Sequence, residues 1–205
     1  MKYITSIIIL VVLVSCETKY NLIDTGLANG RHDCSMYEYF RLQPYDWDST
    51  RLMIERADLI DLFEGKRVGF EHITFFGPTN NTIRRWMIEQ GYESVRDIPV
   101  KLCEQLMLRH VVKGKYKRND IPRGTHGNGS QKGTGGIDLT GAIGNTFWVY
   151  TFRGDYEGIP GTGSVDIYIL SLTGDRLRID VASGDIESNN GIVHSLSYFY
   201  QFGTL

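Results

Sequence analysis

The 205-residue sequence contains few features that point to catalysis, metal binding or nucleic-acid binding. Its 22 Lys and Arg residues are balanced by 24 Asp and Glu residues, and no basic run is present, which argues against a nucleic-acid partner. The five histidines include no pair at metal-ligand spacing, and no cysteine has zinc-site spacing. No G-x-S-x-G elbow, H-E-x-x-H motif or calcium loop occurs. We therefore expect no enzyme, cofactor or metal centre.

A glycine-rich stretch, residues 123–136, contains six of the 23 glycines. Within it, residues 127–134 superficially suggest a phosphate-binding loop. That loop requires Gly-Lys followed by Ser or Thr, whereas this chain has Lys132-Gly133-Thr134. We predict no nucleotide site here. Because the stretch has no hydrophobic period, we expect a mobile loop or an irregular hairpin.

The chain also lacks a long hydrophobic run. Its apolar stretch at residues 7–14 is far shorter than the roughly 20 residues of a transmembrane helix. It lies between Lys2 and the small residue Ser15, which is typical of a secretory signal peptide; a short uncleaved anchor and a buried strand are the alternatives. Residues 13–16 (LVSC) resemble the lipobox of bacterial lipoproteins. The resemblance implies cleavage before Cys16 and acyl chains such as palmitate on that residue.

This interpretation divides the chain into a signal peptide (residues 1–15), a lipidated Cys16 with a flexible tether (16–34) and one domain (35–205). Several acyl chains on one cysteine give stable membrane anchoring. We expect an outer-membrane lipoprotein of a Gram-negative envelope, facing the periplasm or the cell surface. Cys34 and Cys103 would meet an oxidising compartment and could pair. Free thiols are favoured, because Cys103 lies in a predicted helix where a buried thiol is common.

Hydrophobic periodicity predicts helices in the first part of the domain. A polar side chain of Thr79 or Asn80 is expected to cap the helix that ends at Gly91, because a short side-chain oxygen accepts from the first free N–H groups. The predicted helices lie near residues 35–40, 49–57, 58–64, 80–90 and 99–109.

The rest of the chain is rich in predicted strands. Thr173-Gly174-Asp175 and Asn190-Gly191 are expected to form hairpin turns, the second because both central residues of its turn type need positive φ. Helices first and strands later indicate an α+β fold. The predicted strands lie at residues 71–76, 111–116, 145–152, 165–169, 177–181, 185–188, 192–196 and 198–202.

Three segments, in this order, resemble the fasciclin domain family. Residues 73–80 (ITFFGPTN) are similar to the family's TVFAPTN segment. Residues 106–116 (LMLRHVVKGKY) are similar to LLxYHVVxGxY, and residues 184–194 (GDIESNNGIVH) to ADIxASNGVIHVID. The openings at residues 35–40 and 57–63 also fit. The resemblance therefore covers about residues 35–203, nearly all of the mature chain.

The resemblance implies a wedge of about seven strands with several helices packed on it, and an extracellular role in adhesion or protein interaction without catalysis. His110 and His194 are interpreted as hydrogen-bonded core imidazoles, with a binding role as the alternative. The residues that match the family motif are Pro78, Thr79, Asn80, His110, Asn190, Gly191 and His194.

Several positions depart from the family pattern. Arg109 stands where the family's adhesion-associated Tyr-His pair has tyrosine, which argues against integrin-type recognition. Gly77 replaces the family's alanine. Further departures are Thr82 and Ile83 in place of Ala-Phe, and Ser195 and Ser197 in place of Val and Asp.

Aromatic residues, 12% of the chain, are a surplus that the motifs do not explain. Trp47, Trp148 and Tyr150 could form an exposed platform, since aromatic faces stack on sugar rings and hydrophobic partners. Alternatively, Trp148 and Tyr150 fill the second face of a covered sheet. Two functions remain open: adhesion or protein contact by an anchored fasciclin domain, or accessory glycan binding by a surface lipoprotein of a polysaccharide-uptake system.

Overall fold

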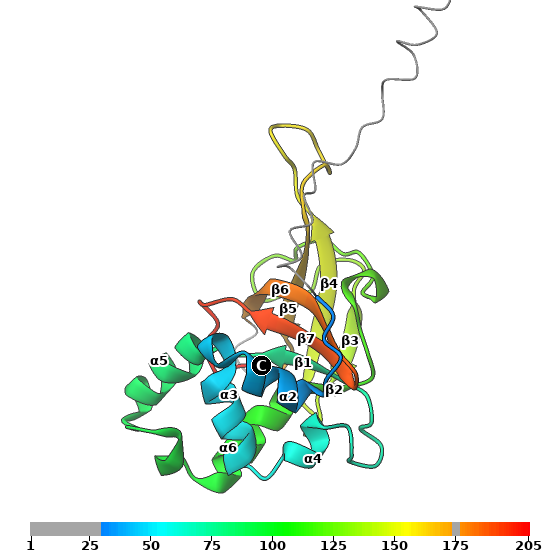
Figure 1. The fold of residues 1–205 in the computed structure, drawn as a ribbon. Coiled ribbons are helices and arrows are strands. Elements are labelled where there is room, and N and C mark those ends of the chain that lie inside the picture. Colours follow the sequence, from blue (N-terminus) through cyan, green and yellow to red (C-terminus); the bar gives the residue numbers. More distant parts are fainter. Residues whose placement is uncertain (1–29, 174–176) are drawn as a thin grey trace, which may run out of the picture.

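The computed structural model describes residues 30–173 and 177–205 and confirms the α+β fold. Figure 1 shows the helices gathered at one end of the molecule, while the β4–β5 hairpin projects from the opposite end. The helices are α2 (Met36–Leu42), α3 (Pro44–Arg56), α4 (Ile60–Phe63), α5 (Asn80–Gln90) and α6 (Val100–Arg109), with 3₁₀ turns η1 (Val95–Asp97) and η2 (Arg118–Asp120). The strands are β1 (Ile73–Gly77), β2 (Val111–Lys113), β3 (Ile137–Thr140), β4 (Thr146–Arg153), β5 (Val165–Ser171), β6 (Arg178–Ser188) and β7 (Gly191–Leu196).

One seven-stranded sheet has the order β2-β1-β7-β6-β5-β4-β3. Only the β1–β7 neighbours are parallel; the other pairs are antiparallel. The two edge strands of this sheet, β2 and β3, end close to each other: Val112 forms an isolated bridge with Gly141, and the Ala142 amide donates to the Val111 carbonyl oxygen at 2.9 Å. The sheet is therefore strongly curled and nearly closed, with a concave inner face and a convex outer face.

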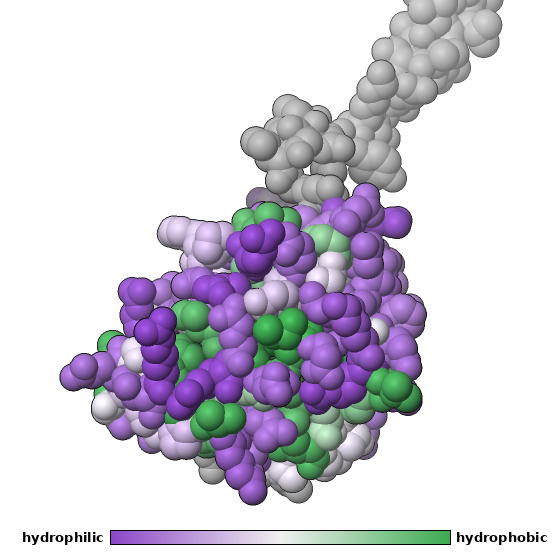
Figure 2. All heavy atoms as spheres, turned by 60° about the horizontal axis from the view of Figure 1, so that its bottom comes forward, coloured by the Kyte–Doolittle hydropathy of each residue, from purple (hydrophilic) through white to green (hydrophobic). Residues whose placement is uncertain are grey.

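The helices cover the outer face of this sheet over β1 and β7, and the inner face is filled by the sheet's own side chains, such as Phe76 and Phe147. Phe63 and Phe75 meet edge to face with ring centroids 5.0 Å apart, and Phe40 packs beside both. All three are fully buried. Figure 2 shows that the outer surface of the helical end is mostly hydrophilic, with separate apolar spots. Within residues 30–173 and 177–205, every helix is too short or too polar to cross a bilayer.

Two predicted strand assignments were wrong. Residues 185–188 do not form a separate strand but continue β6, which bends at register shifts between Val181 and Ile186. Residues 198–202 form no strand. The Arg85 guanidinium donates to the carbonyl oxygens of Tyr198 (3.0 Å) and Tyr200 (2.6 Å). These backbone acceptors are therefore satisfied by a side chain and not by the hydrogen bonds of a neighbouring strand. Strand β3 was not predicted, and α3 begins at Pro44 rather than near 49, since proline suits a first helical turn.

The chain joins the domain before the predicted boundary at residue 35. The Glu187 amide donates to the Gly30 carbonyl oxygen at 2.6 Å, and the His32 amide donates to the Glu187 carbonyl oxygen at 2.8 Å. Residues 30–34, predicted to belong to the tether, therefore lie along β6. Both remaining cysteines are free, and Cys103 is buried beside Met53. The predicted signal peptide and Cys16 lie outside the described residues.

Candidate functional site

His110 and His194, the two histidines of the family motif, are fully buried and hydrogen-bonded on both ring nitrogens. His110 Nδ1 donates to the Leu106 carbonyl oxygen at 2.6 Å, and its Nε2 accepts from the Tyr200 hydroxyl at 2.8 Å. His194 Nε2 donates to the Tyr116 carbonyl oxygen at 2.8 Å. Burial lowers the pKa of His110 to about 4 and also lowers the pKa of His194. Both imidazoles are thus neutral supports of the core, as the favoured interpretation predicted.

Asn190 and Gly191 join the β6–β7 turn to the helices. The Asn190 side chain accepts from the Met36 amide at 2.8 Å, at the start of α2, and donates to the Phe63 carbonyl oxygen at 3.0 Å, at the end of α4. A Cβ atom at Gly191 would lie 2.2 Å from the Ile73 carbonyl oxygen. Both residues are therefore required by packing, and neither faces a ligand.

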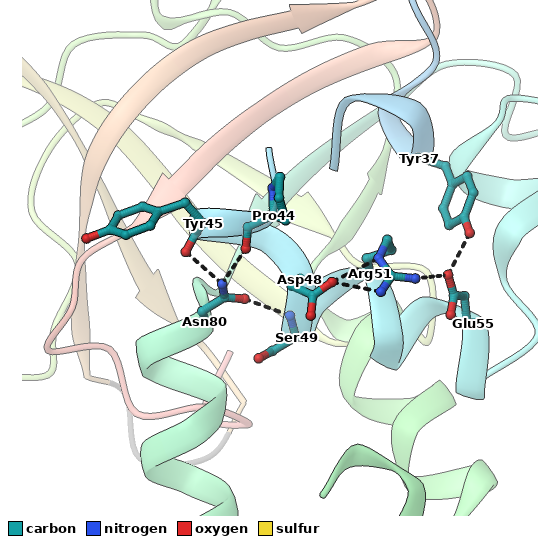
Figure 3. A network of polar contacts seen from close by, with 8 residues as sticks. All are labelled: Tyr37, Pro44, Tyr45, Asp48, Ser49, Arg51, Glu55 and Asn80. Atoms are coloured by element: carbon teal, nitrogen blue, oxygen red, sulfur yellow. Dashed lines mark hydrogen bonds and ion pairs between the residues drawn. The ribbon is translucent and has the colours of Figure 1, made fainter. Parts of the chain in front are cut away.

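The segment from Pro78 to Asn80 joins β1 and α5 to α3, and Figure 3 shows the contacts of Asn80. The Thr50 hydroxyl donates to the Pro78 carbonyl oxygen at 2.6 Å. Thr79 precedes the helix in extended conformation but makes no side-chain capping bond. Asn80 points away from its own helix: its amide nitrogen donates to two carbonyl oxygens at the start of α3, and its Oδ1 accepts from the Ser49 amide at 2.6 Å. The predicted cap is instead a link between two helices.

The aromatic residues proposed as a platform occupy two different places. Trp47 is 2% exposed and packs against Phe40, with ring centroids 5.0 Å apart. It belongs to the core and offers no ring face to a ligand. Trp148 and Tyr150 lie on the outer face of the sheet, stacked at 4.1 Å, yet they are only 3% and 1% exposed. They fill the second face of a covered sheet, which was the alternative interpretation.

The glycine-rich stretch covers this part of the outer face. The Trp148 indole nitrogen donates to the Gly135 carbonyl oxygen at 2.9 Å, and the Tyr150 hydroxyl is hydrogen-bonded to His126 Nδ1 at 2.7 Å. A Cβ atom at Gly136 would lie 2.3 Å from the same indole nitrogen. Burial raises the pKa of Tyr150 to about 12. Glycine thus lets the backbone lie flat on aromatic rings.

Beside the edge of this cover, the strand register brings a charged pair to the surface. Trp148 lies opposite Leu170 and Leu170 opposite Arg178, while Tyr168 lies opposite Asp180, so all of these side chains share the outer face. The Arg178 guanidinium lies over the Tyr168 ring at 5.5 Å. A hollow of about 310 Å³ opens between this pair and the glycine-rich stretch.

Comparison with protein families identifies the family of this chain. The family described as the fasciclin domain matches residues 46–199, most of the chain. The chain belongs to the fasciclin family. A search of curated proteins gave no match. Among solved structures, the chain is similar to a FAS1 domain pair from the insect cell adhesion molecule fasciclin I, with 12% identity and a TM-score of 0.44. The alignment covers 82% of this chain and 46% of that structure, so the chain spans about half of its length.

Two departures of this fasciclin domain from the family pattern have a structural explanation. Arg109 donates to the main-chain oxygens of Gly203 (3.0 Å) and Leu205 (3.2 Å), so it fastens the C-terminal segment against α6. A Cβ atom at Gly77 would lie 2.6 Å from the Trp47 ring. Gly77 therefore makes room for the tryptophan.

Sequence reasoning missed the surface residues of the outer face of the fasciclin domain. Arg178, Asp180 and the 82%-exposed Phe199 were not proposed as contacts. One signal was available, because charged residues alternate with Ile179 along a predicted strand and must share its outward face. Among the described residues, no group of three or more His, Cys, Asp or Glu side chains is placed to hold a metal ion.

Proposed function

We propose that this chain is a lipid-anchored envelope protein whose fasciclin domain acts in adhesion or protein–protein contact, without catalysis. The observation that carries the proposal is membership of the fasciclin family, whose domains are generally linked to adhesion or protein interaction. The resemblance of residues 13–16 to a lipobox supplies the anchor, through acyl chains on Cys16. Export would place the domain in the periplasm or on the cell surface.

The use of polar side chains supports a non-catalytic role. His110 and His194 are buried, uncharged at neutral pH and committed to neighbouring groups, so neither reaches a substrate. The side chains that do face solvent include large aromatic ones: Tyr45 is 92% exposed and Phe199 is 82% exposed. Aromatic residues are enriched where proteins contact each other.

Replacement of the lipidated residue tests the anchor. The Cys16→Ala variant of the full chain, produced in a Gram-negative host, should not be cleaved before residue 16 or acylated. It should therefore leave the membrane fraction in which the acylated protein is found. Cys34→Ala is the matched control and should remain processed and membrane-bound. Membrane partition and mobility of Cys16→Ala identical to those of the unaltered chain would contradict the anchoring proposal.

Adhesion is tested on cells that display the anchored chain. Cells that produce it should adhere to one another or to a protein-coated surface several-fold more than cells that produce Cys16→Ala at the same level. In-cell cross-linking should recover the same partner protein in independent preparations. Unchanged adhesion together with no reproducible partner would contradict the proposed role. Glycan binding, the second candidate, is favoured by one specific surface, described next.

A further inference from the structure

Two hollows lie on either side of Arg178 and Asp180, on the outer face of the sheet. The first, about 310 Å³, lies between this pair and the glycine-rich stretch. The second, about 160 Å³, lies between the same pair and the C-terminal segment that includes Phe199 and Gln201. Because Arg178 and Asp180 line both hollows, one ligand can occupy both and contact the pair in the middle.

The fold explains why these two side chains remain available. Arg178 and Asp180 point outward from β6, and they share the lining of the first hollow with residues 127–131 of the cover. Their side chains are 50% and 56% exposed, and they form only a loose ion pair with 3.7 Å between Arg178 Nε and Asp180 Oδ1. Both therefore retain free hydrogen-bonding capacity toward a ligand.

The charges of the site select the class of ligand. Among the described residues that line the two hollows, Arg178 and Asp180 are the charged ones, and their charges are opposite. An anion attracted by Arg178 would be repelled by Asp180, and the reverse holds for a cation. Neutral donors and acceptors surround the pair, including the side chains of Gln131, Gln201 and Thr204. Such a mixture suits an uncharged ligand that carries many hydroxyl groups.

An accessible aromatic ring lies at one end of the site. Phe199 lines the second hollow and is 82% exposed, and the Tyr198 ring is 5.5 Å from it. An exposed ring can stack on the apolar face of a sugar. This assignment differs from a platform of Trp148 and Tyr150, whose rings are covered and form only the floor of the first hollow.

We propose that this surface, the Arg178–Asp180 groove, binds a neutral oligosaccharide of at least two sugar rings. One ring lies in each hollow, hydroxyl groups accept from the Arg178 guanidinium and donate to the Asp180 carboxylate, and Phe199 stacks on a sugar face. The first hollow reaches the lower end of the volume range of ligand pockets. The inference rests on the described groove and does not depend on the adhesion role.

Titration calorimetry with the full mature chain in lipid nanodiscs tests the groove. The probes are neutral hexasaccharides of glucose, mannose and xylose with different linkages, and a polygalacturonate hexamer as the charged comparison. We expect at least one neutral hexasaccharide to bind and its monosaccharide to bind at least tenfold more weakly. Arg178→Ala and Asp180→Asn should each weaken binding at least tenfold, and Phe199→Ala at least threefold.

Tyr45→Ala is the matched control, since it removes an exposed aromatic ring at the start of α3 that lines neither hollow, and it should leave binding unchanged. Equal melting temperatures of the variants would show that they are folded. Three results would overturn the proposal: no neutral hexasaccharide binds, the charged hexamer binds best, or binding survives both Arg178→Ala and Asp180→Asn. Capture of a protein partner through the groove that oligosaccharides do not inhibit would also overturn it. The three calorimetric results do not bear on the Cys16 anchor or on cell adhesion, and a captured protein partner would overturn this inference while supporting the proposed function, so the two failures are distinguishable.

Discussion

Two regions of the outer face of the curled sheet are covered in different ways. Over β1 and β7, helices supply large side chains, and Phe40, Phe63 and Phe75 interlock with no solvent exposure. Over β4 and β5, the sheet supplies the large side chains and the cover supplies almost none. There, Trp148 and Tyr150 stack on each other beneath a loop of glycines.

This difference shows that a glycine-rich segment can be tightly packed and need not be flexible. A helix backbone cannot lie directly on a sheet of aromatic rings, because the helix's own side chains stand between the two, just as side chains hold stacked sheets about 10 Å apart. A glycine backbone can lie directly on the rings and satisfy polar atoms there, as Gly135 does for the Trp148 indole nitrogen. The two covers should therefore differ in stability, in response to pH and in sensitivity to small substitutions.

The largest expected effect comes from removing a ring from the helix-covered region. Phe75→Ala should lower the free energy of unfolding by about 3–5 kcal/mol, because the helices cannot collapse fully into the cavity that remains. Chemical denaturation followed by circular dichroism measures it. A loss below about 1 kcal/mol would mean that the helix-covered face is not the main core.

Acidification should act mainly through the helix-covered region. The pKa of His110 is about 4 when folded and about 6.5 when unfolded, so the unfolded chain binds more protons between these values. Stability should therefore fall as the pH drops from about 6.5 towards 4, by roughly 3 kcal/mol from this residue. Denaturation curves at pH 7 and pH 4.5 measure the loss.

A matched pair of histidine variants assigns this pH dependence. His110→Gln should reduce the pH dependence strongly. His126→Gln, in the glycine-rich cover, should change it little, because burial is what lowers both pKa values and His126 is exposed whereas His110 is fully buried. An equal pH dependence in the His110→Gln variant and the unaltered chain would contradict the assignment.

Glycine substitutions test how tightly the glycine-rich cover packs on Trp148 and Tyr150. Gly136→Ala should cost about 2 kcal/mol, because its Cβ atom would collide with the Trp148 indole nitrogen. Gly129→Ala is the control: it has a similar positive φ (61° against 67°) but no atom within 4 Å of the added carbon, so it should cost about 1 kcal/mol or less. Thermal melts with Trp fluorescence measure both. Equal costs would show that the loop does not lie tightly on the rings.

The smallest expected effect is the loss of one hydrogen bond from the outer face. Tyr150→Phe removes the hydroxyl that bonds His126 and should cost about 1 kcal/mol, the usual net contribution of such a bond. Tyr45→Phe, which removes a hydroxyl from a 92%-exposed side chain, should cost nothing measurable. A Tyr150→Phe variant as stable as the unaltered chain would mean that water replaces the bond at no cost.

Local sequence patterns correctly predicted helices whose structure depends mainly on the spacing of their own apolar residues. Helices near 80–90 and 99–109 follow from apolar spacing. A hairpin turn was also predicted at Asn190-Gly191, but the reason was wrong: the loop is Asn189-Asn190, Gly191 begins β7, and neither Asn190 nor Gly191 has positive φ. The C-terminal segment was different. Its aromatic residues suggested a strand, but arginines on α5 and α6 bind its carbonyl oxygens, and no local pattern indicates such distant partners.

The candidate site was predicted only in part for the same reason. The family motif correctly drew attention to His110 and Asn190, and their burial agrees with structural roles. The covering of Trp148 depends on a loop whose sequence has no hydrophobic period, so nothing in that stretch indicates what it packs against. The groove at Arg178 and Asp180 requires the register of β5 with β6, together with the position of Phe199 after β7.

Residue-resolved hydrogen exchange of the native protein tests the difference between the two covers most directly. Amides of β1 and β7 under the helices should exchange only through global unfolding. The Thr125 and Gly136 amides, which bond the two sides of the glycine-rich cover, should exchange through a local opening of lower free energy. Gly136→Ala should accelerate the second set many times more than the first. Equal protection of both sets, or equal acceleration of both by Gly136→Ala, would contradict the account.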